Sequence, residues 1–177
     1  MSKALFREAL KKIRSAISPK RRFEASSSLL EFAKKLAASH TLILLFASFQ
    51  NEIDTQAVNH YLAHKKMLAL PRIENGSLSF YKVVDFEMET ALNGWGIYEP
   101  KSDLCEKIPS HAITTILIPG LGFDRGRHRL GYGKGHYDRF LKMVPHAFSI
   151  GIGFQEQYLD QLPTEPHDAP LTQLALF

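Results

Sequence analysis

The 177-residue chain has only one cysteine, Cys105, so no disulfide can form within it. No apolar run approaches the about 20 residues that a membrane-spanning helix needs. The first twenty residues are charged throughout and lack the hydrophobic core of a secretion signal. These absences exclude a disulfide-stapled scaffold and predict a cytoplasmic protein that does not enter a membrane.

What the chain does contain is typical of one globular domain. Hydrophobic residues make up 45%, which is enough for a substantial core at this length. We therefore expect one domain over residues 1–177, working as a monomer. The formal charge of +4 favours an anionic partner, but this charge suits nucleic acid, a nucleotide or a polycarboxylate equally well.

Hydrophobic periodicity predicts a succession of helices and strands. Helices are expected at residues 2–17, 19–39, 55–65, 154–162 and from Arg139 onward. The second begins at Ser18-Pro19, a capping residue followed by a helix-starting proline, and should bury Phe23, Leu30, Ala33, Leu36 and Ala37. Strands are expected at residues 41–46, 67–73, 77–84, 113–118 and 147–153. This alternation predicts a three-layer α/β/α domain with a mostly parallel sheet.

The chain is organised around residues 116–143, where an apolar strand leads through a glycine-rich basic loop into a helix. This arrangement can bind phosphate, because glycines expose backbone N–H groups and a helix N-terminus adds more. The spacing Gly131-x-Gly133-x-Gly135 matches neither the dinucleotide motif nor the nucleotide phosphate loop. The glycines alone fit a phosphate site and a solvated surface loop equally well. The nearby cations favour the phosphate site, namely Arg125, Arg127, Arg129 and Lys134.

Asp138 follows this loop and allows two interpretations. An acid beside an anion site is favourable when a cation lies between them, which suggests Mg²⁺ held by one carboxylate and phosphate oxygens. Considered alone, however, Asp138 is better explained as a carboxylate that stabilises its own helix N-terminus.

Residues 119–141, PGLGFDRGRHRLGYGKGHYDRFL, resemble the signature of the 5-formyltetrahydrofolate cyclo-ligase family. The resemblance covers nearly the whole chain, strongly at 116–141 and weakly at 20–40 and 85–112. It implies the fold of phosphosugar isomerases and CoA transferases. It also implies ATP- and Mg²⁺-dependent cyclisation of 5-formyltetrahydrofolate to 5,10-methenyltetrahydrofolate.

The resemblance further implies roles for particular residues. In the family an N-terminal lysine and an arginine four residues later contact ATP, and Lys3 and Arg7 have that spacing. The remaining ATP contacts would be Arg129, Leu130, Gly131, Tyr132, Gly133, Lys134, Gly135, His136 and Tyr137, with Arg129 and Lys134 catalytic. The folate contacts would be Ala47, Glu52, Trp95, Tyr132, Gly133, Lys134, Gly135 and His136, with Tyr137 as a further stacking wall. Asp138 would hold Mg²⁺.

Without the resemblance, several of these residues have simpler explanations. Lys3, Arg7 and Arg14 share one border of the first predicted helix and would ordinarily form a solvated face. Glu52 would be a surface carboxylate, and Trp95 fits the core as well as it fits a ligand site.

The chain also departs from the family pattern. His136 stands where tyrosine is common, and Gly126-Arg127-His128 replaces a commoner x-Gly-Asn turn. A second metal-binding acid is expected near Thr172, where this chain has no acid. His167 lies in a family-like ending and is a candidate catalytic residue, although a loop histidine explains it more simply.

Two other classes of function remain open at the level of the sequence. A phosphosugar isomerase on the same fold would have a phosphate site and no need for a nucleotide. A basic nucleic-acid-binding protein would bind in a salt-sensitive way, but the sequence shows no reader helix and no alternation of aromatic and basic residues.

Overall fold

The computed structural model describes residues 2–165 and 168–177. Its helices are α1 Lys3–Ala16, α2 Pro19–Ala37, α3 Gln56–His64, α4 Phe86–Glu89 and α5 His136–Met143, with short 3₁₀ turns η1 Ser110–Ala112 and η2 Gln155–Gln157. Its strands are β1 Ile43–Leu44, β2 Leu68–Glu74, β3 Ser77–Val83, β4 Thr90–Leu92, β5 Tyr98–Pro100, β6 Glu106–Ile108, β7 Thr115–Pro119, β8 Gly122–Asp124, β9 Arg129–Leu130, β10 Phe148–Gly153, β11 Tyr158–Leu159 and β12 Gln173–Leu176.

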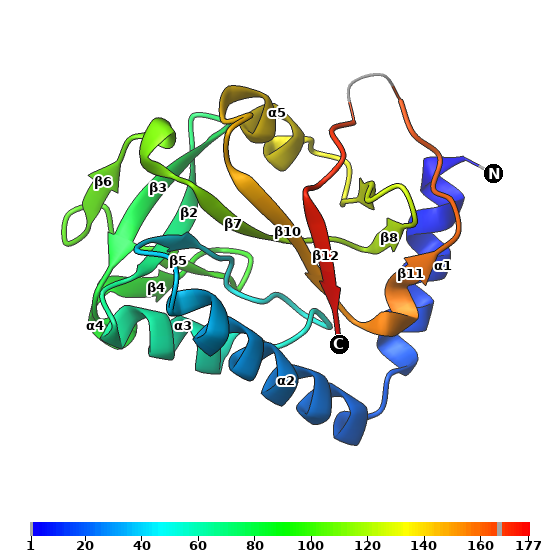
Figure 1. The fold of residues 1–177 in the computed structure, drawn as a ribbon, viewed down its shortest axis with the longest axis horizontal. Coiled ribbons are helices and arrows are strands. Elements are labelled where there is room, and N and C mark those ends of the chain that lie inside the picture. The colour runs from blue at the N-terminus through cyan, green and yellow to red at the C-terminus, as the bar shows by residue number, and fades with distance from the viewer. Residues whose placement is uncertain (1, 166–167) are drawn as a thin grey trace.

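The main sheet has seven strands in the order β12-β10-β7-β1-β2-β3-β6 (Figure 1). The five strands from β12 to β2 are parallel, which requires helical crossovers such as α3 between β1 and β2. Strands β3 and β6 are added antiparallel at one edge. The hairpin between β2 and β3 turns at Asn75-Gly76, both with positive φ, as its sequence predicts. The expectation of a mostly parallel sheet is confirmed.

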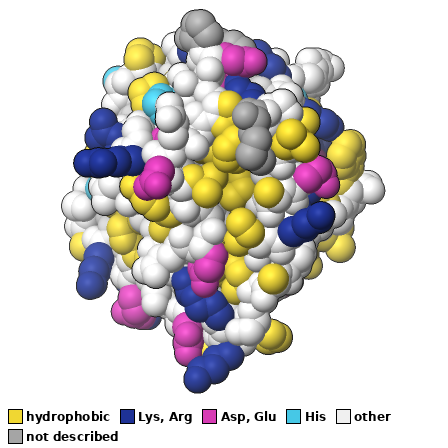
Figure 2. Space-filling model, turned by 90° about the vertical axis from the view of Figure 1, so that its right-hand side faces the viewer, with side chains coloured by type: hydrophobic (Ala, Val, Ile, Leu, Met, Phe, Trp, Pro, Cys, Tyr) yellow, Lys and Arg dark blue, Asp and Glu magenta, His cyan; other side chains and the backbone are white. Residues whose placement is uncertain are grey.

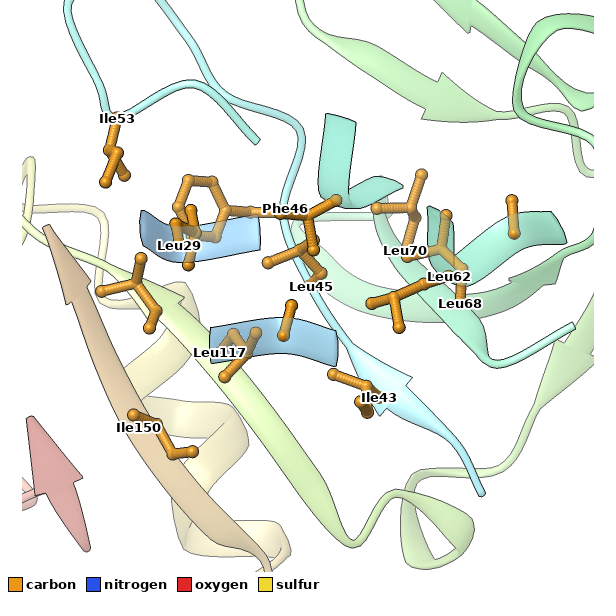
Figure 3. Packing of buried hydrophobic residues seen from close by; sticks show 14 of the residues in the cluster. Leu29, Ile43, Leu45, Phe46, Ile53, Leu62, Leu68, Leu70, Leu117 and Ile150 are labelled. Carbon is orange, nitrogen blue, oxygen red and sulfur yellow. The ribbon is translucent and has the colours of Figure 1, made fainter. Parts of the chain in front are cut away.

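Helices cover both faces of this sheet. Alternate residues of β1 point in opposite directions, so Ile43 packs in the cluster with α2 and α3 while Leu44 joins the cluster with α5. Figure 3 shows the first cluster, where Leu29 of α2 and Leu62 of α3 lie over the β-strand residues. The three-layer α/β/α prediction is therefore confirmed.

Helix α1 lies outside these layers, beside the carboxyl ends of the strands (Figure 1). Its Leu10 packs with Leu121, Leu130 and Leu162 in a separate small cluster. Because Leu121 and Leu130 flank the β8–β9 hairpin that leads into the glycine loop, this packing brings the cations of α1 next to that loop.

Some local predictions were wrong. Phe23 is 74% exposed, because the buried stripe of α2 runs through Ala25, Leu29 and Ala33. The other residues expected to be buried in this helix do pack on the core: Ala33 is fully buried, and Leu30, Leu36 and Ala37 are partly buried. Residues 154–162 form η2 and β11 rather than a helix, since β11 pairs with β8. His167 lies outside the described residues.

No helix in the described part of the chain is long and apolar enough to cross a membrane.

Candidate active site

A cleft of about 1080 Å³ opens where β1 and β7 end, the usual ligand position in an open α/β sheet. Segments that are distant in sequence form its walls: α1, the loop after β1, the β2–β3 hairpin, the β4–β5 turn, the end of β7, the glycine loop and the C-terminal segment. The ATP, folate and metal contacts implied by the resemblance all line this cleft, namely Lys3, Arg7, Ala47, Glu52, Trp95, Arg129, Leu130, Gly131, Tyr132, Gly133, Lys134, Gly135, His136, Tyr137 and Asp138. Arg125 and Arg127 were also expected among the cations of the phosphate site, but they do not line the cleft.

The glycine loop has a backbone that side chains would disturb. Gly133 has φ 102°, and a Cβ added there would lie 3.3 Å from the Arg7 guanidinium. Gly135, with φ 63°, is the N-cap of α5 and has no side chain to occupy the helix N-terminus. The first N–H groups of α5 therefore remain available for an anion beside the loop.

Salt bridges and hydrogen bonds hold the charged residues of this loop in place. The buried Arg129 donates to Asp138 at 2.8 Å and lies 5.4 Å from the Tyr137 ring centroid. Arg139 donates to the Lys134 carbonyl at 2.9 Å and contacts His136. Burial, with the neighbouring positive charges of Arg139 and Lys134, lowers the pKa of His136, so this side chain is neutral near pH 7.

Helix α1 supplies two cations to the same cleft. Lys3 forms salt bridges to Asp168 at 2.6 Å and Glu165 at 2.9 Å, which connect the helix to the C-terminal segment. Burial lowers the pKa of Lys3, but hydrogen bonds to these two acids outweigh that effect and leave the pKa raised. Arg7 donates through Nε to the Gly131 carbonyl at 2.9 Å, so its guanidinium is fixed over the glycine loop.

Glu52 lines the cleft from the loop after β1 and is buried, with a side chain only 8% exposed. Burial raises its pKa to about 7, although a hydrogen bond from the Phe49 N–H and the charge of Arg14 both oppose this shift. The simple expectation of a solvated surface carboxylate is therefore wrong. A carboxylate that changes charge near neutral pH inside a cleft is typical of a functional site.

Trp95 projects from the β4–β5 turn and is 65% exposed, so it does not belong to the core. The Asn93 side chain shapes this turn by accepting hydrogen bonds from the N–H groups of Trp95 and Ile97. The Lys134 amino group lies 4.0 Å from the Trp95 ring centroid, a cation–π contact across the cleft. An aromatic face is thus held opposite the glycine loop.

The residues present fit a Mg²⁺ ion that bridges the protein and phosphates. Within the described residues there is no group of three or more His, Cys, Asp or Glu side chains able to enclose a metal. Mg²⁺ is commonly bound by one or two carboxylates together with phosphate oxygens, and Asp138 is such a carboxylate. Thr172, where a second acid was expected, bonds Ser149 beside the sheet, whereas Asp168 lines the cleft.

Sequence reasoning missed several residues of the site. Asn93, Glu165 and Asp168 line the cleft, and Arg14 lies behind it. Arg14 is only 2% exposed, so its assignment to a solvated face was wrong, and Ile13 faces solvent instead. A helical stripe of residues at this spacing could have indicated the burial: it consists of Lys3, Arg7, Leu10, Arg14 and Ile17. The stripe was not recognised, because three of its members are cations and cations are expected on the solvent face.

On the face that carries α1, the charges of the described residues do not form a nucleic-acid-binding stripe. Figure 2 shows acidic and basic side chains interspersed there around a group of hydrophobic side chains. Nucleic-acid-binding surfaces instead concentrate Lys and Arg in one patch.

Comparisons with known proteins identify the family of the chain. The family model described as the 5-formyltetrahydrofolate cyclo-ligase family matches residues 1–176. The 5-formyltetrahydrofolate cyclo-ligases of Haemophilus influenzae and Mus musculus are each 29% identical, covering 93% and 95% of this chain and 92% and 90% of their own. The NMR structure of Aquifex aeolicus 5,10-methenyltetrahydrofolate synthetase matches with a TM-score of 0.87 at 28% identity, over 98% of this chain and 89% of that one. With a match along essentially its whole length, the chain belongs to the 5-formyltetrahydrofolate cyclo-ligase family.

Proposed function

We propose that this protein couples ATP hydrolysis to the cyclisation of 5-formyltetrahydrofolate, with Mg²⁺ as cofactor. One observation carries the proposal: a single cleft combines an anion site with a buried carboxylate and an exposed aromatic face. Lys3, Arg7, the glycine loop and the α5 N-terminus suit the phosphates of ATP. Glu52 and Trp95 suit a flat heterocycle that carries N–H donors.

The chemistry requires activation of a formamide, whose oxygen is a poor leaving group. Transfer of the γ-phosphoryl group to the formyl oxygen releases ADP and converts that oxygen into part of a phosphate ester. N10 of the folate then attacks the activated carbon and loses its proton. The carbon–oxygen bond breaks, phosphate departs, and the product is 5,10-methenyltetrahydrofolate.

The protein contributes position and charge rather than a covalent nucleophile. Lys134, released from Trp95, and Arg129 neutralise the transferring phosphoryl group, while Lys3 and Arg7 hold the other phosphates. The backbone N–H groups of residues 131–137 bind oxygens without side-chain bulk. Asp138 would hold Mg²⁺, which would supply further positive charge for the phosphates. Arg129 orients this carboxylate through their 2.8 Å contact.

Glu52 and Trp95 hold the folate. The ionised Glu52 accepts hydrogen bonds from pterin N–H groups, and Trp95 stacks on the ring, with Tyr132, His136, Ala47 and Tyr137 completing the walls. Since Lys134 contacts both Trp95 and the phosphate site, it connects the two substrates. A monomeric, cytoplasmic, single-domain enzyme remains our prediction.

The test is to mix the purified protein with 5-formyltetrahydrofolate and Mg²⁺ and follow the absorbance of the methenyl product, with and without ATP. We expect product only with ATP. Lys134→Ala and Asp138→Asn should each lower kcat/KM by at least about a hundredfold, the scale of losing one charged group at a phosphoryl-transfer centre. Lys142→Ala, on the exposed side of α5, is the matched control.

A folded protein that binds ATP but forms no product would contradict the proposal. It would leave a phosphosugar isomerase as the alternative, which sugar-phosphate substrates would then test without nucleotide. Loss of activity in Lys142→Ala would show that α5, rather than the site, had been damaged.

A further inference from the structure

Arg14 is a buried cation that the proposed mechanism does not use. It lies on α1 two helical turns after Arg7, and its side chain is 2% exposed behind the wall of the cleft. Burying a guanidinium costs several kcal/mol of folding free energy unless its donors are satisfied. A purely structural residue at this position would be expected to be apolar.

The Arg14 side chain contacts Tyr132 and Glu52, two residues that line the cleft. Its Nη2 donates to the Tyr132 hydroxyl, and its Nη1 lies 3.9 Å from Glu52 Oε1. Neither Nε nor Nη1 has a hydrogen-bond partner among the described residues. The positive charge near Glu52 therefore explains the position of Arg14, and two of its N–H groups are not used in hydrogen bonds.

A second cation fixes the backbones of both partners. Arg22 of α2 donates to the carbonyls of Arg14 and of Asn51, the residue before Glu52. It also bonds the Ile17 carbonyl at 3.1 Å. The distance between Arg14 and Glu52 is thus set by α2 rather than by a flexible surface loop.

We propose that Arg14 is a positioning residue that stabilises the negative charge of the Glu52 carboxylate and holds the Tyr132 hydroxyl in place before folate binds. The inference rests on the proposed role of Glu52 in folate binding. Arg14 orients residues in one wall of the cleft. Lys3 and Arg7, on the same helix, lie on the ATP side.

The charges around Glu52 support this assignment. Arg14 approaches it from α1, the Phe49 N–H from its own loop, and the neutral phenols Tyr132 and Tyr137 from the glycine loop and the start of α5. Burial raises the Glu52 pKa, whereas Arg14 lowers it. Without Arg14 the pKa must rise further, so a larger fraction of Glu52 would be protonated at neutral pH, and the protonated carboxyl accepts N–H donors less well.

The test compares Arg14→Met, which removes the charge, with Arg14→Lys, which keeps it. In the pH profile of kcat/KM, Arg14→Met should move the acid limb upward by at least one pH unit and raise the folate KM at pH 7 at least tenfold. The KM for ATP should change less than twofold. In Arg14→Lys the acid limb should lie close to that of the wild type, because the charge is kept, but the contact with the Tyr132 hydroxyl should be lost.

Arg21→Met is the control, because Arg21 is a half-buried arginine that bonds Glu156 and the Phe177 carbonyl, away from Glu52. It should lower the melting temperature without moving the pH profile. If Arg14→Met does not fold, Arg14→Gln replaces it, since the amide is neutral yet can donate to Tyr132.

A measurement of the Glu52 carboxyl pKa by NMR separates this inference from the proposed function. A higher pKa in the neutral variants supports the role of Arg14 even if the wild type makes no methenyl product. An unchanged Glu52 pKa and an unchanged acid limb, with only a lower melting temperature, would overturn it.

Discussion

At the scale of single residues, Glu52 should favour binding and oppose folding. Its pKa rises from 4.5 in the unfolded chain to about 7 in the folded protein. Between these values the folded protein binds more protons, so the free energy of unfolding falls as pH rises through this window. Above pH 7 the free energy of unfolding is lower by up to about 3 kcal/mol than it is below pH 4.5.

Glu52→Gln should remove this pH dependence. We expect the variant to be stabilised relative to wild type by an amount that grows from pH 5 to pH 8, measured by urea unfolding at several pH values. Its folate KM should rise, because the amide cannot replace a carboxylate acceptor. Glu24→Gln, on the surface of α2, should show no such trend. A stability difference that is constant with pH would contradict the prediction.

Arg127 provides a second test, because its backbone has φ 63° in the tight turn between β8 and β9. This left-handed conformation costs a non-glycine residue about 1 to 2 kcal/mol, whereas glycine adopts it freely. Arg127→Gly should therefore raise the melting temperature slightly, despite losing a 3.2 Å contact to the Thr172 carbonyl.

The neighbouring substitution Arg125→Gly is the matched control for Arg127→Gly. It adds the same unfolded-state entropy without relieving a positive φ, so it should lower the melting temperature. Equal effects in the two variants, measured by calorimetry, would show that the turn carries no strain.

The sequence predicted the role of single residues correctly where the backbone conformation requires a particular residue. It did not predict the role of residues whose function depends on their burial in the folded protein. Gly133 and Gly135 were recognisable because their spacing indicates a loop that approaches an anion. The burial of Glu52 and Arg14 was not, because each is buried against the other from segments 38 positions apart. Only the tertiary structure brings their charges together.

At the scale of elements, the β4–β5 turn contains a natural reporter of the site. Trp95 is the only tryptophan of the chain, and Lys134 lies 4.0 Å from its ring centroid. At an exposed site such a contact is worth about 0.5 to 1 kcal/mol, so phosphates can draw the lysine away easily. We expect Mg²⁺–ATP to change the intrinsic tryptophan fluorescence.

Lys134→Ala tests this interpretation, because it leaves Trp95 without the cation. At saturating ATP, the variant should show no ATP-dependent change, whereas Lys142→Ala should respond like the wild type. If Lys134→Ala keeps the full change while binding ATP, movement of another group causes the signal.

Helices and strands were predictable from the sequence where interactions between residues close in the chain determine them. The strand, glycine loop and helix of residues 113–143 follow from apolar runs and glycines, and all are present. Residues 154–162 look helical in isolation, but Tyr158–Leu159 pair with Phe123–Asp124 across the chain. The β4–β5 turn was equally hidden, although its Asn93 cap and Trp95 decide one wall of the cleft.

At the scale of the whole molecule, the site exists only in the folded chain, since its walls come from residues 3 to 168. A ligand that binds only the folded state stabilises it by about 2.7 kcal/mol at a hundred times its Kd. For a chain of this size, that corresponds to a rise of roughly 5 to 10 °C in melting temperature. ATP with Mg²⁺ and 5-formyltetrahydrofolate should each produce such a rise.

Removal of the metal should separate these two ligands. If Asp138 and the phosphates share Mg²⁺, EDTA should abolish most of the rise caused by ATP and leave the rise caused by the folate unchanged. In Asp138→Asn, the shift with ATP should be small and insensitive to EDTA, because the amide binds Mg²⁺ weakly. A wild-type shift with ATP that survives EDTA would mean that Lys3, Arg7 and the glycine loop bind the phosphates without the metal.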